Sequence, residues 1–106
     1  MIIYIDIDNT IFDTKTTNYE ESIPNKYLID IANSLYNQGY TIVYWTARGT
    51  ITGINWYDLT KKQLDNSGVL YHELKMGKPA YDLLIDDKSI NNLLEVRNFN
   101  TILSST

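Results

Sequence analysis

The sequence predicts an α/β fold: a three-layer, Rossmann-like parallel sheet of about five strands with helices on both faces. Short runs rich in β-branched residues alternate along the chain with segments of helical periodicity. Strands joined by helices form parallel sheets with right-handed crossovers. The chain has 106 residues, 43% of them hydrophobic and 21% charged, a length that holds a single core. We therefore expect one domain over residues 1–106.

The first half of the chain contains two predicted strands and one helix. Residues 2–6 form an apolar run that ends in an acid, which is typical of a buried parallel strand. Residues 13–23 are polar and lack periodicity, so they predict a loop or a small hairpin flap. Apolar residues at helical spacing predict a helix over about 25–38, and Gly39 suits its C-terminal cap. Residues 41–46 are a second β-rich run.

The second half continues the alternation of helices and strands. A weaker helical stripe begins at Trp56 and ends before Gly68. After it, the same patterns predict a strand over 69–74, a strand over 81–86, a helix over 90–96 and a strand over 101–103.

Polar side chains follow three of the predicted strands. Asp6 and Asp8 come at the end of the first strand, Thr46 at the end of the second, and Asp86 with Asp87 at the end of the fourth. In open parallel sheets ligands bind beyond the carboxyl ends of the strands. We therefore expect these residues to share one site.

The residue types suit phosphoryl transfer, which needs in-line positioning and compensation of negative charge. A carboxylate such as Asp6 can attack an anionic phosphate only if nearby cations offset the repulsion. Lys78 and a divalent cation on Asp86 would supply those charges. The chain has no cysteine and one histidine, His72, which excludes thiolate and multi-histidine zinc sites. The remaining oxygen ligands favour Mg²⁺.

In chain order, these residues form a pattern that resembles the four motifs of the haloacid dehalogenase superfamily of phosphohydrolases. The pattern consists of Asp6-Ile7-Asp8-Asn9-Thr10, then Thr46, then Lys78, then Asp86-Asp87, and the resemblance spans residues 2 to about 90. It implies a magnesium-dependent phosphomonoester hydrolase that works through a phosphoaspartate intermediate.

The resemblance also implies roles for the two acids of the first motif. Asp6 would form the phosphoaspartate and contact the magnesium ion. Asp8 would protonate the leaving group and then activate water, while its backbone carbonyl binds the metal.

The later motifs would hold the phosphoryl group and the ion. Thr46 would donate a hydrogen bond to the phosphoryl oxygens, and Lys78 would steady both the nucleophile and the phosphate. Asp86 would ligate magnesium directly. Asp87 would either bind the ion through water or pair with Lys78.

Four neighbouring residues are candidate substrate-binding residues: Asn9, Thr10, Ala47 and Arg48. Asn9 stands where the family most often has glycine, and asparagine tolerates left-handed backbone angles. Arg48 suits either of two roles, which are equally weighted: it holds a second anionic group of the substrate, or it forms a surface ion pair with an acid.

Cap domains of this superfamily enter between the motifs, in the gaps that here span residues 11–41 and 47–77. Each gap is already occupied by one predicted helix, so we expect no cap domain and an open site. An open site accepts bulky substrates or borrows a lid from another subunit, which predicts a homo-oligomer.

The substrate is expected to be a phosphorylated small molecule. The chain also resembles small capless proteins of capsular or lipopolysaccharide biosynthesis. The resemblance lies in residues 44–49, in Gly77-Lys78-Pro79 and in Ile85-Asp86-Asp87, and it implies that the substrate is a phosphorylated sugar or a polysaccharide precursor. One alternative is a polynucleotide end phosphatase, but the net charge of −4 and the absence of a basic run argue against nucleic acid. Another is a non-catalytic module that binds phosphate or metal.

The N-terminal apolar run meets Asp6 too soon for a signal peptide or a membrane span. We therefore expect a cytoplasmic protein with no membrane association.

Overall fold

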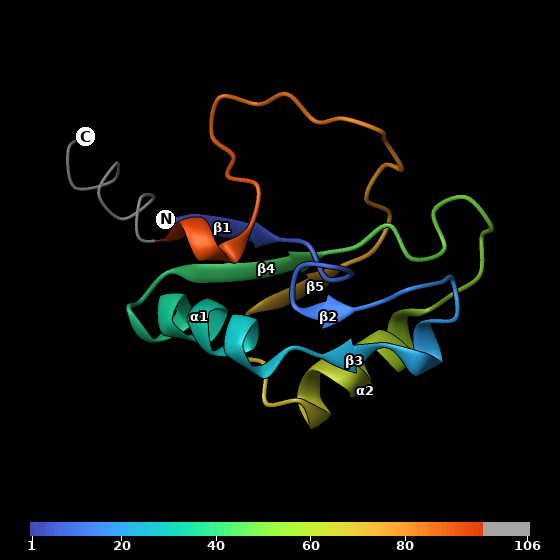
Figure 1. The fold of residues 1–106 in the computed structure, drawn as a ribbon, viewed down its shortest axis with the longest axis horizontal. Helices are drawn as coiled ribbons and strands as arrows, with labels where there is room; N and C mark the ends of the chain where they lie inside the picture. The colour runs from blue at the N-terminus through green and yellow to red at the C-terminus, as the bar shows by residue number, and fades with distance from the viewer. Residues whose placement is uncertain (97–106) are drawn as a thin grey trace.

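The computed structural model describes residues 1–96 (Figure 1). In chain order, the elements are β1 (Ile2–Ile5), β2 (Phe12–Asp13), the 3₁₀ helix η1 (Tyr19–Glu21), β3 (Ile23–Pro24), α1 (Lys26–Asn37), β4 (Thr41–Trp45), α2 (Tyr57–Asn66), β5 (Glu73–Lys75) and the 3₁₀ helix η2 (Leu93–Glu95). The α/β prediction is confirmed, and within residues 1–96 the main sheet has three strands, where about five were expected for the chain.

Three parallel strands form the main sheet, in the order β1-β4-β5. Ile5 pairs with Tyr44, and Tyr44 pairs with Leu74, so these three side chains lie on one face of the sheet. Residues 13–23, predicted as a loop or a small hairpin flap, are bounded by the antiparallel pair β2 and β3, which confirms the hairpin. No cap domain lies in either gap between the motifs, both of which fall within the described residues.

The core lies on the face of the sheet that carries Ile5, Ile42 and Tyr44. Ile29, Ala32 and Leu35 of α1, Leu64 of α2 and Leu93 of η2 join the same buried cluster. On the opposite face, Ile2 and Tyr4 are exposed. The expectation of helices on both faces is therefore wrong for residues 1–96, because the helices described there all contribute to one core.

Helix α1 matches its prediction to within a residue at each end. The Asn25 side chain accepts a hydrogen bond from the backbone N–H of Leu28, which caps the first turn. At the other end Gly39 has φ +95°, a left-handed conformation that costs glycine little. Helix α2 confirms the second helical stripe, and β5 confirms the third strand but covers only its last part.

The predicted strand over 81–86 is wrong in this structure. Every residue from 79 to 92 is exposed, and this segment arches away from the sheet in Figure 1. Its apolar run has strand propensity, but propensity takes effect only where a neighbouring strand pairs with the segment. None of the described strands pairs with it, and Leu83 and Ile85 are 75% and 88% exposed.

The C-terminal predictions have two different outcomes. The helix expected over 90–96 is a single 3₁₀ turn, Leu93–Glu95, whose first turn is capped by the side chain of Asn92. The strand expected over 101–103 lies outside the described residues. Within residues 1–96 no helix has the length and apolar character needed to span a membrane.

Candidate active site

A cavity of about 350 Å³ opens where β1 and β4 end and where the chain leaves β5. Six of the residues chosen from the sequence line it: Asp6, Asp8, Asn9, Ala47, Arg48 and Lys78. The parallel sheet brings these residues together from three separate segments, as expected at the carboxyl edge of such a sheet. Thr14, Thr16, Tyr19, Pro79 and Tyr81 complete the lining.

Asp6 and Lys78 form an ion pair at this cavity, with 3.5 Å between the Asp6 Oδ1 and Lys78 Nζ atoms. The Asp6 side chain is 37% exposed and that of Lys78 is 13% exposed. Burial raises the pKa of Asp6 above its ordinary value, and the positive charge of Lys78 opposes this shift. The cavity therefore holds a partly desolvated carboxylate beside a cation.

Lys78 is positioned by its backbone as well as by its charge. Its N–H donates to the carbonyl of Thr46 at 3.0 Å, and its carbonyl accepts from the Thr50 hydroxyl at 2.7 Å. Its ammonium lies 5.2 Å from the centre of the Tyr81 ring. The two hydrogen bonds tie the Lys78 backbone to the segment that follows β4, which anchors the cation beside Asp6.

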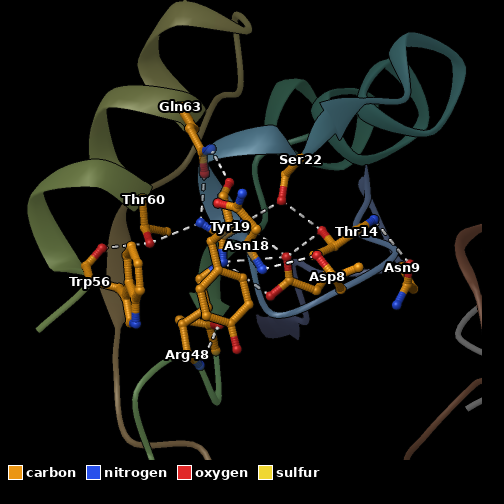
Figure 2. Close-up of polar contacts among 12 residues, drawn as sticks. Asp8, Asn9, Thr14, Asn18, Tyr19, Ser22, Arg48, Trp56, Thr60 and Gln63 are labelled. Carbon is orange, nitrogen blue, oxygen red and sulfur yellow. Dashed lines mark hydrogen bonds and ion pairs between the residues drawn. The ribbon is translucent and has the colours of Figure 1, made fainter. Parts of the chain in front are cut away.

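Asp8 is held by a partly buried network that Figure 2 shows. The Arg48 guanidinium donates from Nε to Asp8 Oδ2 at 3.0 Å and from Nη2 to Asp8 Oδ1 at 2.8 Å. The Thr14 hydroxyl donates to Asp8 Oδ1 at 2.6 Å and also contacts the Ser22 hydroxyl. Both carboxylate oxygens of Asp8 therefore accept hydrogen bonds from the protein.

Arg48 uses all five of its N–H donors inside the protein. Besides Asp8, they reach the Thr60 hydroxyl, the Gln63 side-chain oxygen and the Ser22 hydroxyl. The residue is 2% exposed, and the guanidinium carbon lies 4.7 Å from the centre of the Tyr19 ring. Of its two predicted roles the ion pair is present, in a buried rather than a surface setting.

The turn after Asp8 has the backbone that the sequence led us to expect. Asn9 has φ +60° and is the non-glycine residue with positive φ among residues 1–96. Its side-chain oxygen accepts from the backbone N–H of Thr14 at 3.1 Å, which stabilises the loop. Thr10 is half-buried in this turn, with its N–H on the carbonyl of Ile7, and does not line the cavity.

Thr46 is buried next to Ala47 and does not line the cavity. The residue is 1% exposed, and its hydroxyl oxygen accepts from the backbone N–H of Arg48 at 3.1 Å. Its own N–H donates to the carbonyl of Lys75. In this arrangement Thr46 shapes the turn that carries Ala47 and Arg48.

Asp86 and Asp87 are not brought to the cavity. Both lie on the exposed arch between β5 and η2. The Asp86 carboxylate accepts from the backbone N–H of Lys88 at 3.0 Å. This hydrogen bond, together with one from Asp87, lowers the pKa of Asp86. Asp86 thus stabilises a local turn.

The fold is similar to that of known structures. The crystal structure of an MCSG target from Vibrio cholerae aligns over 96% of this chain and 98% of its own, with 25% identity and a TM-score of 0.79. A chain in the structure of the Pnkp1/Rnl/Hen1 complex aligns over 96% of this chain, with 16% identity and a TM-score of 0.58. The match covers 34% of that chain, so the present chain spans about a third of its length. No protein family and no curated protein matches the sequence.

The cavity offers the oxygen ligands that a magnesium ion prefers, but too few of them. Asp6 and Asp8 contribute hard carboxylate oxygens, and those of Asp8 are already engaged by Arg48. Residues 1–96 contain no group of three or more acidic or histidine side chains that could hold an ion. The arrangement described here therefore does not form a complete magnesium site.

Several residues that build the site carried no signal in the sequence. Thr14, Ser22, Thr60 and Gln63 orient Asp8 and Arg48, and Tyr19 covers the guanidinium. They come from the hairpin segment and from α2, and they follow no spacing that would connect them with the acids. Chemically, the site combines an accessible carboxylate, an adjacent ammonium and a rigidly held second carboxylate.

Proposed function

We propose that this chain is a phosphomonoester hydrolase in which Asp6 is the nucleophile. The observation that carries the proposal is the Asp6–Lys78 pair, which lies in an open cavity at the carboxyl edge of a parallel sheet. An ammonium 3.5 Å from the carboxylate can offset the repulsion between that carboxylate and an incoming phosphate. The similar fold in the Pnkp1/Rnl/Hen1 complex is consistent with a phosphatase module of the haloacid dehalogenase type.

The proposed reaction has two displacement steps. In the first, an Asp6 oxygen attacks phosphorus, the ester P–O bond breaks, and the alcohol leaves with a proton. In the second, water attacks the resulting acyl phosphate, which releases inorganic phosphate and frees Asp6. Lys78 would stay beside the phosphoryl oxygens through both steps and offset their charge.

Asp8 is the proposed proton carrier of these steps. It would give a proton to the leaving oxygen and take one from the attacking water. The bonds from Arg48 and Thr14 fix the carboxylate in place. A proton on Asp8 would occupy an oxygen that accepts one of these hydrogen bonds. Protonation of Asp8 would therefore weaken at least one hydrogen bond from Arg48 or Thr14.

We propose Mg²⁺ as the cofactor, with Asp6 and Asp8 as ligands together with Asp86 and Asp87. A bound ion would supply positive charge near the phosphate. Because Asp86 and Asp87 lie on the exposed arch, this ligand set requires the arch to approach the cavity.

The nucleophile is tested with p-nitrophenyl phosphate in the presence of magnesium. The wild type should release p-nitrophenol, and Asp6→Asn should lose at least about a thousandfold in rate, because no other group replaces the attacking carboxylate. A matched control is Asp30→Asn, which removes an exposed acid on α1. Equal rates for Asp6→Asn and the wild type would remove Asp6 from the mechanism. A chelator should abolish hydrolysis by the wild type if magnesium is the cofactor.

A second candidate function is a non-catalytic module that binds phosphate. The observations that favour it are the exposed position of Asp86 and the full engagement of Asp8 by protein donors. Such a module would bind inorganic phosphate but turn over no ester. The same assay should be repeated with sugar phosphates and with end-phosphorylated oligonucleotides. Hydrolysis of either would identify a sugar phosphatase or a polynucleotide end phosphatase, and phosphate binding without any hydrolysis would identify the non-catalytic module.

A further inference from the structure

A second cavity of about 320 Å³ adjoins the first. Tyr19 and Ala47 line both cavities, so the two lie side by side with these residues between them. Asp6 and Lys78 line the first cavity and are absent from the lining of the second. The second cavity instead borders Ile51, Ile54 and Trp56. A molecule with its anionic group beside Lys78 could therefore extend into it.

The loop that walls the second cavity has a defined shape. Thr50 N–H donates to the carbonyl of Ala47, and Gly53 N–H donates to the carbonyl of Gly49 at 2.8 Å. Gly49 has φ +82°, and a β-carbon there would collide with the carbonyl oxygen of Ile54. The Thr50 hydroxyl bonds the carbonyl of Lys78, which links the loop to the first cavity. The cavity is thus preformed, as small-molecule sites usually are.

Apolar side chains in this loop are exposed without contributing to the core. Ile51 is 84% exposed and Ile54 is 53% exposed, and neither belongs to the buried cluster. Trp56 packs edge-on against Tyr19, with 5.1 Å between the ring centres. A ligand that covered the two isoleucines would gain free energy from the removal of apolar surface from water.

We propose that the second cavity is the leaving-group subsite of the phosphatase function proposed above, and that it binds an aromatic ring on the alcohol side of the phosphomonoester. In an in-line displacement the leaving oxygen lies opposite the attacking Asp6 oxygen, so the alcohol points away from Asp6. The second cavity lacks Asp6 and touches the first at Tyr19 and Ala47, which suits this direction.

The lining favours a flat apolar ring over a sugar. Thr17, Tyr19 and Thr52 supply the side-chain hydroxyls of the second cavity, and the Thr52 hydroxyl already accepts from the backbone N–H of Ile54. A sugar would bury several hydroxyl groups with too few partners, and each unpaired group costs free energy. A ring instead gains contact with Trp56 and Tyr19.

Binding to the full chain with Asp6→Asn tests the subsite without turnover. Titration calorimetry would compare 2-naphthyl phosphate, adenosine 5′-monophosphate, glucose 6-phosphate and inorganic phosphate. The double variant Ile51→Ser, Ile54→Ser should lower the affinity for 2-naphthyl phosphate about tenfold and leave the affinity for inorganic phosphate unchanged. Ile2→Ser is the matched control, because Ile2 is 65% exposed at the start of β1 and lines neither cavity.

A second measurement uses the unmodified loop. The indole N–H resonance of Trp56 should shift on addition of 2-naphthyl phosphate, whereas that of Trp45, in β4 and outside both cavities, should not. Tighter binding of adenosine 5′-monophosphate than of the naphthyl ester would identify the ring as a nucleobase, and the reverse order would identify it as an aryl group. Tighter binding of glucose 6-phosphate than of both, or an unmoved Trp56 resonance, would overturn the subsite.

The subsite and the proposed phosphatase function can be refuted separately. If the wild type hydrolyses esters but the double variant binds 2-naphthyl phosphate as tightly as Ile2→Ser does, the subsite is wrong and the phosphatase stands. If the ring-dependent contrast is present but no ester is hydrolysed, the ring site stands and the phosphatase function is wrong.

Discussion

At the scale of single residues, Asp6 shows how a site residue affects folding. Burial raises its pKa above the ordinary value of 3.8, so the native state holds this proton to a higher pH than the unfolded chain does. The group therefore favours folding most below its ordinary pKa. That contribution is lost as the pH rises through the raised pKa.

Asp6→Asn should therefore be more stable than the wild type at neutral pH. The difference in the free energy of unfolding should shrink as the pH falls below 3.8, because Asp6 is then protonated in both states. Urea denaturation in the presence of a chelator, at several pH values between 3 and 7, measures this. Asp30→Asn controls for the loss of an acid outside the cavity, and a difference that does not vary with pH would contradict the assignment.

Removal of the Arg48 side chain should lower the free energy of unfolding far more than removal of an exposed cation. Arg48→Ala leaves the Asp8 carboxylate without its ion pair and should lower the free energy of unfolding by on the order of 3 kcal/mol. Arg48→Lys should recover little, because one ammonium cannot replace five planar donors. Lys61→Ala is the control, since Lys61 pairs with Asp65 at the surface. Chemical denaturation compares them, and similar losses for Arg48→Ala and Lys61→Ala would be inconsistent with the network.

Sequence reasoning at this scale succeeded where the cause was local. The left-handed conformation of Asn9 depends on its own side chain and on the turn it occupies, so it was predictable. The partners of Arg48 were not, because Asp8 lies 40 positions away in the sequence. No short pattern records such a contact. The partners of its five N–H donors decide between the two roles of Arg48, and those partners come together only in the folded chain.

At the scale of elements, the loop from Ala47 to Trp56 depends on one glycine. Gly49→Ala should lower the free energy of unfolding by about 2–4 kcal/mol, from left-handed strain and from the clash with Ile54. Gly53→Ala is a matched control: Gly53 also has positive φ, but a β-carbon there meets open space. It should cost about 1 kcal/mol. Equal losses in denaturation experiments would mean that the close approach to Ile54 has no energetic weight.

The predicted elements were recovered where periodicity and pairing agree. β1, α1 and β4 each show their own pattern and also pack against one another, so both signals indicate the same structure. The segment 81–86 has the pattern of a strand but none of the pairing among residues 1–96. Two of the six predicted catalytic or metal-binding residues, Asp86 and Asp87, lie on or just after that segment. The prediction of the metal site therefore depended on the element whose pairing the sequence could not determine.

At the scale of the whole molecule, the site is open and apolar side chains are exposed around it. Leu83, Leu84 and Ile85 on the arch are all more than half exposed, as are Ile2 on β1 and Ile51 in the loop. Such surface is stabilised when another chain covers it. We therefore predict a homo-oligomer, in which a neighbour covers the open cavity. Light scattering across a concentration series tests this prediction, and a monomer at every concentration would refute it.

The network around Arg48 has a consequence for the rate at which the protein unfolds. It joins the hairpin, the end of β4 and helix α2, so it can form only after these three segments have met. We therefore expect the network to form after the transition state for folding. Disruption of the network should thus leave the refolding rate nearly intact and shorten the lifetime of the native state. The interaction that orients Asp8 would then also determine how long each folded molecule persists.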